Sequence, residues 1–517
     1  MTGIDEMKIR ELQAQNTMLG NLVASYSADI AALNAKVASM KETIEKLQKM
    51  LFGRKSERVV DNGLQMFLPG MEPSAEDGQD VASDEKEHVN AHDRKKAAGQ
   101  PKAGWNSFPE ELEREEKVID LPPEDRDGLE FIGYDVSERL VRRSAYLVQV
   151  VKRAKYAKPG ESGFGVVTAP APAVPSCLSA DTDRCHYDVS VIAHIIAEKL
   201  VDHIPFYRQS EMFARLGIGF GRSAMCSYFA KVSEALTPLY GIMVKEIMEC
   251  EIVHADETHV DMLEPGNGKT RAAWIWARRT GVGPPLTGFH FSRDRSKGTA
   301  EKLFGDYLGT IIRDGFVGYD DLPAEAAGCW AHCRRKFIEA TGNHPQYAGQ
   351  ALALVRTLYM NERIARDAAQ AGGGETALFK QRRRVRTQSA PVVGQYFALC
   401  RRVVDGEPPT SAIAKAAAYS LRQETELRRF LENPKLNIDN NPCENVMRPF
   451  CIGRKNWLFV GNENGGTSMA VLASFAATCK DNGVDFEKWL GDVLTRLDTC
   501  KASEMRSLLP HIWKQTH

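Results

Sequence analysis

Apolar residues recur with a seven-residue period over residues 9–51. One position of each heptad holds mostly β-branched residues, and the position three residues later holds mostly leucine, a combination that favours a two-stranded parallel coiled coil. Asn16 occupies a position of the first kind, where a polar side chain fixes register and oligomeric state. The pattern therefore predicts a multimerising helix over residues 1–55. The alternative is a helix that packs on the body of the same chain.

The apolar period ends after this helix. Residues 56–105 carry a block of acidic residues and then a basic block with few apolar ones, which predicts a disordered acidic linker. Short β-like runs with interspersed basic residues follow over residues 106–168 and predict a small β-rich segment. The basic face of this segment would either contact phosphate or simply be solvated.

Residues 177–245 have a helical pattern. An apolar helix ends at Leu216, Gly217 follows in a turn, and a second helix begins near Arg222. Two helices around a glycine-containing turn fit a helix-turn-helix, whose second helix would present Arg222 and Ser223 to DNA. A tight helical hairpin without DNA contact has the same pattern, so both interpretations stay open.

Strand-like and helical patterns alternate over residues 250–460, and residues 461–517 are expected to form a C-terminal helical element. Strands are expected at 251–262, 272–279, 286–292 and 309–313, with a helix near 297–307. Helical patterns at 347–370, 376–386 and 411–432 indicate a helical insertion over about residues 345–432. Its QRRRVR run, residues 381–386, is a candidate DNA contact, with a solvated helix face as the alternative. The whole pattern predicts a multi-domain α/β protein.

Composition narrows the choice of partners. The 517 residues carry a net charge of −1, so affinity for nucleic acid must come from local basic clusters. No run of 18 or more apolar residues occurs, so no membrane-spanning helix is expected. The 11 cysteines form no CxxC pair, and the polar N-terminus does not resemble a signal peptide. Both features favour a reduced, cytoplasmic protein.

Three separated acidic residues, each within a dense local motif, are the strongest functional signal. Asp256 lies in a strand-like run, Asp314 follows the apolar pair Ile311–Ile312, and Glu444 lies at the start of a predicted helix. Phosphodiester chemistry needs an activated nucleophile and a neutralised leaving oxygen, which two carboxylate-bound Mg²⁺ ions provide. The three acids therefore predict a metal-dependent phosphoryl-transfer site.

Two of these assignments have local alternatives. Strand alternation places His254 and Asp256 on one face and Glu257 on the other, so only one of the adjacent acids can be a direct ligand. We favour Asp256 because its central position suits metal binding. Glu444 follows Asn441, a potential helix cap, at a position where glutamate commonly has only a capping role. On the residues alone, capping and catalysis are equally open for Glu444.

Basic side chains near these acids in the sequence could hold a DNA backbone. The candidates are His332, Arg334, Arg335, Lys336, Arg448, Arg454 and Lys455. Cys329, His332 and Cys333 could suggest zinc. A structural zinc site needs four ligands, however, and no fourth is evident nearby in the sequence, so structural zinc is not expected.

The ordered motifs together resemble transposases of the insertion-sequence-66 family. They are LFGRKSER, YDVSERL, DHIPFYRQ, HADET, the DG at 314–315, CWAHCRRKF, DNNPCENVMRP and GRKNWLFVG. The resemblance implies a ribonuclease-H-like catalytic domain over residues 250–460, with a DDE triad that falls on Asp256, Asp314 and Glu444. It also implies Mg²⁺ or Mn²⁺ as cofactor, terminal inverted repeats and target DNA as partners, and small element-encoded accessory proteins.

The resemblance implies a DNA transposase that performs metal-dependent cleavage and strand transfer, nucleoid-associated in the bacterial cytoplasm. The alternatives are a non-catalytic DNA-binding repressor or decayed transposase, and a metal-dependent nuclease without strand transfer. Family members usually carry zinc-binding cysteines on both sides of YDVSERL. The corresponding stretches here, PPEDRDGLEFIG and AKYAKPGESGFG, hold none, so the small β-rich segment is expected to keep its shape without zinc.

Overall fold

The computed structural model describes most of the chain beyond its N-terminal fifth. The described residues are 108, 112–126, 129–142, 146–157, 166–178, 186–264, 266, 268–370 and 373–516. All of them belong to the second of two compact units, Met1–Glu87 and His88–His517. The predicted coiled coil and acidic linker, residues 1–55 and 56–105, lie outside the described residues. Among the helices that are described, none is long and apolar enough to span a membrane.

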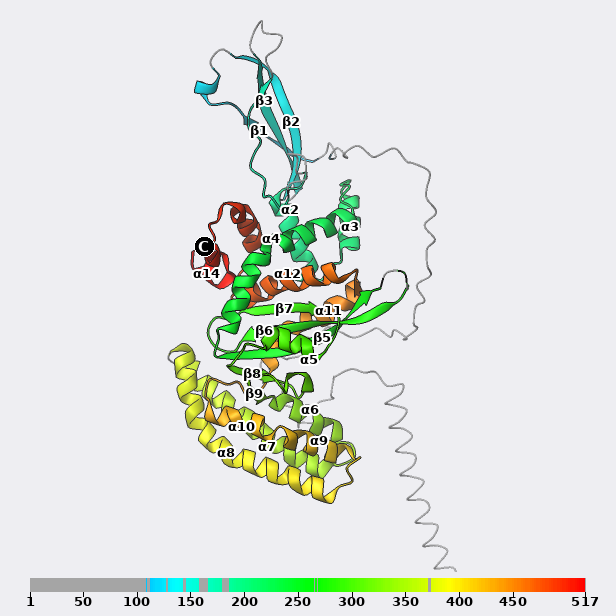
Figure 1. The fold of residues 1–517 in the computed structure, drawn as a ribbon, viewed down its shortest axis with the longest axis vertical. Helices are drawn as coiled ribbons and strands as arrows, with labels where there is room; N and C mark the ends of the chain where they lie inside the picture. The colour runs from blue at the N-terminus through cyan, green and yellow to red at the C-terminus, as the bar shows by residue number, and fades with distance from the viewer. Residues whose placement is uncertain are drawn as a thin grey trace, which may run out of the picture. The chain divides into compact units, whose positions relative to one another are not determined.

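A mixed sheet forms the centre of this unit (Figure 1). Its strands are β5 (Ile252–Leu263), β6 (Thr270–Thr280), β7 (Thr287–Ser292), β8 (Thr310–Arg313), β9 (Glu325–Gly328) and β10 (Phe459–Val460). The order is β7-β6-β5-β8-β9, with antiparallel pairing from β7 to β5 and parallel pairing from β5 to β9. The expected strands are found within two residues at each end, and the mixed α/β class is confirmed.

Helices cover this sheet. A helix was predicted near 297–307, and α5 (Lys297–Phe304) begins at the predicted residue. The Ser296 side chain caps it by accepting a hydrogen bond from the backbone amide of Thr299. α11 (Asn441–Trp457) packs along β5, and α12 (Glu463–Asp481) packs against β7. Beyond α12 the chain continues as α13 (Phe486–Arg496) and α14 (Pro510–Thr516). The C-terminal region is therefore helical, as its pattern predicted.

Five helices lie between β9 and α11 in the sequence and pack into a helical insertion (Figure 1). They are α6 (Trp330–Ala340), α7 (Pro345–Gln370), α8 (Gly374–Gly406), α9 (Ala412–Arg422) and α10 (Glu424–Glu432). Their core includes Trp330, Phe337 and Tyr396, and it is continuous with Ile252 and Ile312 of the sheet. The insertion and the sheet therefore share one apolar core.

Two helix boundaries in the insertion differ from the prediction. The helix expected at 376–386 extends to Gly406 through Pro391, because buried side chains such as Val385 and Val393 anchor it on both sides of the proline. The helix expected at 411–432 is two helices, because the backbone leaves the helical conformation at Gln423.

The small β-rich segment contains β1 (Arg114–Ile119), β2 (Glu130–Arg142), β3 (Tyr146–Ala157) and β4 (Val167–Thr168). Its basic side chains have acidic partners: Lys152 pairs with Glu116 at 2.7 Å, and both Arg153 and Lys155 lie within 3.6 Å of Asp135. Ion pairing within the sheet therefore accounts for much of its basic pattern.

Apolar and ionic contacts also hold the small β-rich segment together. Leu121, Ala154 and Tyr156 form a small buried cluster. The Tyr156 hydroxyl donates to Asp120, and Arg126 forms an ion pair with the same carboxylate at 2.9 Å. These contacts supply local cohesion from side chains that need no metal.

The region predicted as a helix-turn-helix contains α2 (Val189–Leu200), α3 (Phe206–Arg215) and α4 (Arg222–Met248). Gly217 lies in the turn with a φ of 73°, a conformation that favours glycine. The second helix begins at Arg222, as expected, but runs for 27 residues and reaches β7. Arg222 and Ser223 are exposed at its start, so the DNA-binding role stays a prediction.

Candidate active site

Parallel pairing of β5 with β8 brings Asp256 and Asp314 to the same level. His254 pairs with Ile312, so the same register two residues further places Asp256 beside Asp314. Neighbouring strands lie about 4.8 Å apart. Burial, together with the negative charges of neighbouring acids that include Glu444 and Asp314, raises the pKa of Asp256 to about 8. The three acids named by the sequence therefore share one site.

A tight turn fixes Asp314 at the end of β8. Its Oδ1 accepts a hydrogen bond from the Phe316 amide at 2.9 Å, and Arg313 donates to the Phe316 carbonyl at 3.1 Å. A Cβ on Gly315 would lie 2.9 Å from Nε2 of Gln423, at the junction of α9 and α10. A side chain at this position would require Gln423 to shift, so glycine suits the close approach of the helical insertion to the backbone beside Asp314.

Buried asparagines position Glu444. The Asn440 side chain donates to the Ala255 carbonyl at 2.8 Å and bonds His254 Nδ1 at 2.8 Å. These bonds tie the start of α11 to β5, one residue from Asp256. Burial lowers the pKa of His254 to about 4, so its ring is a neutral link between Asn440 and Asn437, whose Nδ2 lies 3.0 Å from Nε2.

The predicted helix cap at Asn441 is wrong. α11 begins at Asn441, its capping position is Asn440, and the Asn440 side chain bonds β5 rather than the helix backbone. Both side-chain oxygens of Glu444 are directed toward α6. Oε2 accepts from Arg335 Nη2 at 3.3 Å, and Oε1 lies 3.6 Å from His332 Nδ1.

Glu257, next to Asp256, faces the opposite side of β5, as strand alternation predicted. Its Oε2 accepts from the Tyr319 hydroxyl at 2.6 Å and its Oε1 from Arg295 Nε at 2.8 Å. The side chain is 1% exposed. Glu257 is therefore held by partners of its own, whereas Asp256 faces the other two acids.

The predicted DNA-contacting residues lie in different environments. His332 and Arg335 gather at Glu444, whereas Arg448 and Lys455 are exposed on α11. Arg454 donates to the His259 carbonyl of β5 at 2.8 Å. On α6, Arg334 is half-buried, and Lys336 lies 3.8 Å from Glu339. Arg222 and Ser223 lie on α4, a separate element.

Three residues that support the site were missed at the sequence level: Asn437, Asn440 and Tyr319. The asparagines belong to the stretch NIDNNPCEN, whose density of amide side chains was the only available signal. Cys333, in contrast, is turned into the insertion core beside Tyr396 and Ser420, away from His332. The three potential ligands that do converge are Cys329, His332 and Glu444, within 4.8 Å of one another.

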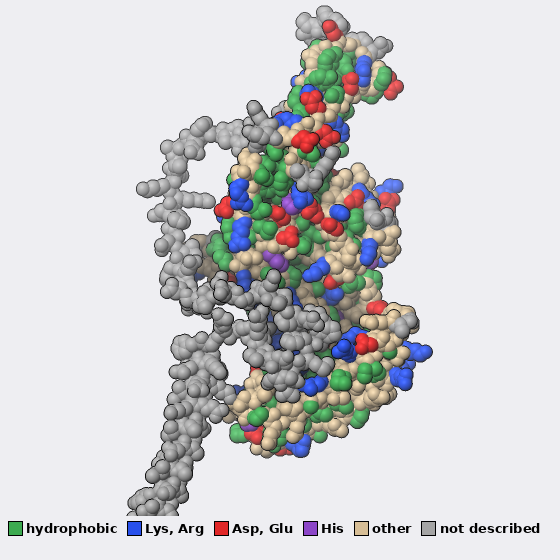
Figure 2. All heavy atoms as spheres, turned by 180° about the vertical axis from the view of Figure 1, so that it is seen from behind, with side chains coloured by type: hydrophobic (Ala, Val, Ile, Leu, Met, Phe, Trp, Pro, Cys, Tyr) green, Lys and Arg blue, Asp and Glu red, His purple; other side chains and the backbone are tan. Residues whose placement is uncertain are grey.

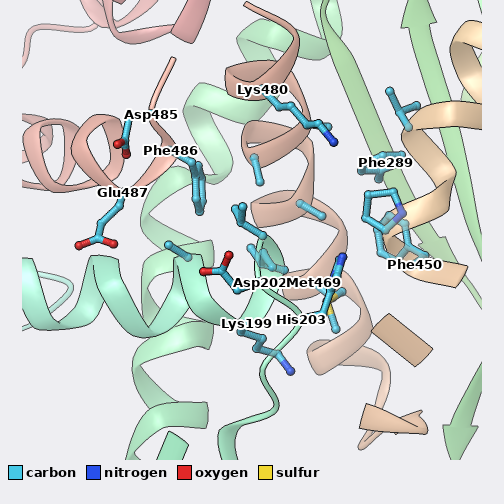
Figure 3. Close-up of a pocket in the computed structure, with 18 of the residues that line it drawn as sticks. Lys199, Asp202, His203, Phe289, Phe450, Met469, Lys480, Asp485, Phe486 and Glu487 are labelled. Atoms are coloured by element: carbon cyan, nitrogen blue, oxygen red, sulfur yellow. The ribbon is translucent and has the colours of Figure 1, made fainter. Parts of the chain in front are cut away.

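A separate cavity of about 470 Å³ lies among α2, α11, α12 and α13 (Figure 3). Apolar side chains such as Phe289, Phe450 and Met469 line it, with Lys199 and Lys480 among its charged residues. None of the three acids belongs to its lining. This cavity is thus distinct from the acidic site.

Charged side chains are mixed over the surface. The face seen in Figure 2 carries lysine and arginine in small groups interspersed with acidic side chains. This distribution agrees with the net charge of −1. On this face, binding of DNA would therefore use local clusters of basic side chains.

A known protein family matches the region of the chain that contains all three acids. Residues 184–468, more than half of the chain, match the family model described as "Transposase IS66 family". The chain belongs to the IS66 transposase family. Residues 39–116 match "Transposase C of IS166 homeodomain", and residues 474–511 match "IS66 C-terminal element". The resemblance read from the motifs is thereby confirmed along most of this IS66-family chain.

Similar proteins match the IS66-family chain over nearly its whole length. "Uncharacterized protein y4qI" of Sinorhizobium fredii (strain NBRC 101917 / NGR234) is 31% identical over 525 residues, which cover 95% of this chain and 93% of that protein. "Uncharacterized protein y4jD" of the same strain is 31% identical over 523 residues, covering 94% and 96%. Their names state no activity, so function has to be argued from the site.

The raised pKa of Asp256 predicts how metal-free stability depends on pH. The folded state holds this proton up to about pH 8, whereas the unfolded chain releases it near the ordinary value of 3.8. The resulting stabilisation is complete below pH 3.8 and is lost as the pH rises toward 8. We expect the melting temperature of chelator-treated protein to fall relative to Asp256→Asn between pH 4 and 8. If the melting temperatures of the two proteins changed with pH in the same way, the raised pKa of Asp256 would be wrong.

Proposed function

We propose that this IS66-family member is a DNA transposase that cuts the ends of an insertion sequence and joins them to target DNA. The convergence of Asp256, Asp314 and Glu444 carries the proposal. Burial, and then repulsion from the neighbouring carboxylates Glu257, Glu444 and Asp314, raise the pKa of Asp256, so its charged form is costly without a cation. Asp256 has no cationic side chain as a partner among its described neighbours. Its carboxylate oxygens are donors of the kind that Mg²⁺ and Mn²⁺ prefer. Two such cations, when bound, would activate a water or a 3′-hydroxyl and neutralise the leaving oxygen.

We infer a ribonuclease-H-like catalytic domain from the strand order β7-β6-β5-β8-β9. Three antiparallel strands followed by two parallel ones support this fold, with one acid on the central strand and one after its parallel neighbour. The third acid comes from α11, which packs on the central strand. The helical insertion then lies between the second and third acids, and residues 250–460 form the proposed catalytic domain.

The remaining parts of the chain have proposed roles in holding DNA. Arg448 and Lys455 are exposed on the helix that carries Glu444 and are suited to contact backbone phosphates. Arg222 and Ser223, exposed at the start of α4, would contact the terminal inverted repeat. Residues 1–55 would pair two protomers, and thereby two ends, through the coiled coil. Small element-encoded proteins are proposed as accessory partners.

The test uses the full chain, labelled element-end DNA, target DNA, Mg²⁺ or Mn²⁺, and the accessory proteins. We expect metal-dependent cleavage at the element end, followed by products in which two ends are joined to one target. Cleavage without joined products would favour a nuclease without strand transfer. Tight end binding without metal-dependent cleavage would favour a non-catalytic DNA-binding protein.

A further inference from the structure

His332 and Glu444 face each other between α6 and α11. His332 Nδ1 lies 3.6 Å from Glu444 Oε1, which is too long for a hydrogen bond. Both atoms are buried, and neither has a hydrogen-bond partner among the described residues. Buried polar atoms are normally satisfied, so two unsatisfied atoms that face each other indicate room for a third group between them.

Neighbouring contacts fix both side chains in this arrangement. Arg335, one turn after His332 on α6, binds Glu444 Oε2 at 3.3 Å and so leaves Oε1 directed toward the imidazole. The start of α6 is itself rigid, because the Trp330 indole is fully buried and donates to the Leu427 carbonyl at 2.9 Å. His332 is therefore presented by a packed helix rather than by a surface loop.

The third member of the cluster is unsuited to binding a metal. Cys329 Sγ accepts a hydrogen bond from the Asn440 amide at 3.2 Å, and the side chain is buried. The sulfur is therefore already engaged by the backbone at the start of α11. The available pair is one imidazole nitrogen and one carboxylate oxygen. Two ligands about 2.0–2.2 Å from one cation lie roughly 3.0–3.6 Å apart, and the observed separation of 3.6 Å matches the upper end of this range.

We propose that His332 is a nitrogen ligand to the divalent cation that Glu444 binds, which gives one metal position a mixed imidazole–carboxylate donor set. The inference rests on the proposed function, which supplies the metal site. It assigns His332 a role different from contact with the DNA backbone. Since Mg²⁺ takes oxygen ligands and imidazole suits transition metals, His332 also shifts the preference of the site toward Mn²⁺.

Pulsed electron paramagnetic resonance of Mn²⁺ bound to the full chain without DNA tests the proposal. We expect a hyperfine coupling from one directly bound histidine nitrogen, which changes to the ¹⁵N pattern when the protein carries ¹⁵N-histidine. The coupling is lost in His332→Gln and kept in His259→Gln, a matched control on the exposed part of β5. Mn²⁺ affinity should fall on the order of 10–100-fold in His332→Gln, with a smaller change for Mg²⁺.

The outcomes separate this inference from the function on which it rests. Mn²⁺ that binds in an Asp256-dependent way without any nitrogen coupling would overturn the role of His332 and leave the proposed function standing. Wild-type protein that binds no Mn²⁺ would overturn both. Isotope labelling of the unmutated protein keeps the test valid even if His332→Gln fails to fold.

Discussion

Asp256→Asn is expected to reduce metal-dependent cleavage of element-end DNA on the order of 10⁴–10⁶-fold, the scale of loss seen when one member of a catalytic unit is removed. Asp256 lies on the central strand and interacts with both other acids, so the substitution removes one of the three proposed metal donors. The asparagine is nearly isosteric and uncharged, and the native carboxyl already holds its proton up to about pH 8. The variant should therefore fold and bind element ends with unchanged affinity. Initial cleavage rates and gel-shift titrations measure the two quantities.

Asp261→Asn is the matched control for this substitution. Asp261 lies on the same strand, five residues beyond Asp256, with a side chain that is 43% exposed. The Asp261→Asn variant should cleave element-end DNA at the wild-type rate. Wild-type cleavage by Asp256→Asn would remove Asp256 from the mechanism. If DNA binding fell together with the melting temperature, misfolding rather than lost chemistry would be responsible.

Local patterns were sufficient to predict the strands that carry the acids. β8 is buried throughout and carries the apolar pair Ile311–Ile312, and period-two alternation on β5 separated Asp256 from Glu257. Which strands pair, and in which register, depends on contacts between residues 58 positions apart in the sequence. The proximity of Asp256 and Asp314 could therefore be predicted only from the family resemblance, and neither motif alone indicates it.

Glu444 shows why side-chain roles are harder to predict than elements. An Asn-Pro-x-Glu start of a helix suits capping and metal binding equally, because both need a carboxylate in the first turn. In the structure the helix start has no side-chain cap bond, and His332 and Arg335 of α6 face the two carboxylate oxygens of Glu444. Those partners lie more than 100 residues away in the sequence, so no local pattern could identify them.

The basic run on α8 was misread for a related reason. Both alternatives at the sequence level placed QRRRVR at the surface, but Arg382 and Arg386 are buried and pair with Glu362 of α7 at 2.9 and 2.6 Å. Their spacing of four residues puts them on one face of the helix, together with the buried Val385. Glu362, the partner that allows both arginines to be buried, lies on another helix, so the run itself does not indicate burial. Only Arg383 and Arg384 of this run are exposed.

Arg386→Ala is expected to lower the free energy of unfolding by about 3–5 kcal/mol, because it leaves the charge of Glu362 buried with a single remaining partner. The Arg386 and Glu362 side chains are each 1% exposed. Arg386 also donates to the carbonyls of Asn433 and Leu436 at 2.9 and 2.8 Å, in the segment that leads to α11. Loss of these bonds should loosen the approach to Glu444, so cleavage should fall as well. Urea unfolding followed by circular dichroism, with cleavage measured in parallel, records both effects.

Arg383→Ala supplies the control on the same helix. Arg383 is exposed three residues before Arg386, and surface substitutions of this kind usually change stability by less than about 0.5 kcal/mol. The two variants remove the same charge, so any common loss of DNA affinity reports electrostatics, and the difference between their unfolding midpoints reports the buried pair. Equal midpoints would mean that the Arg386–Glu362 pair adds nothing to the insertion beyond its apolar core.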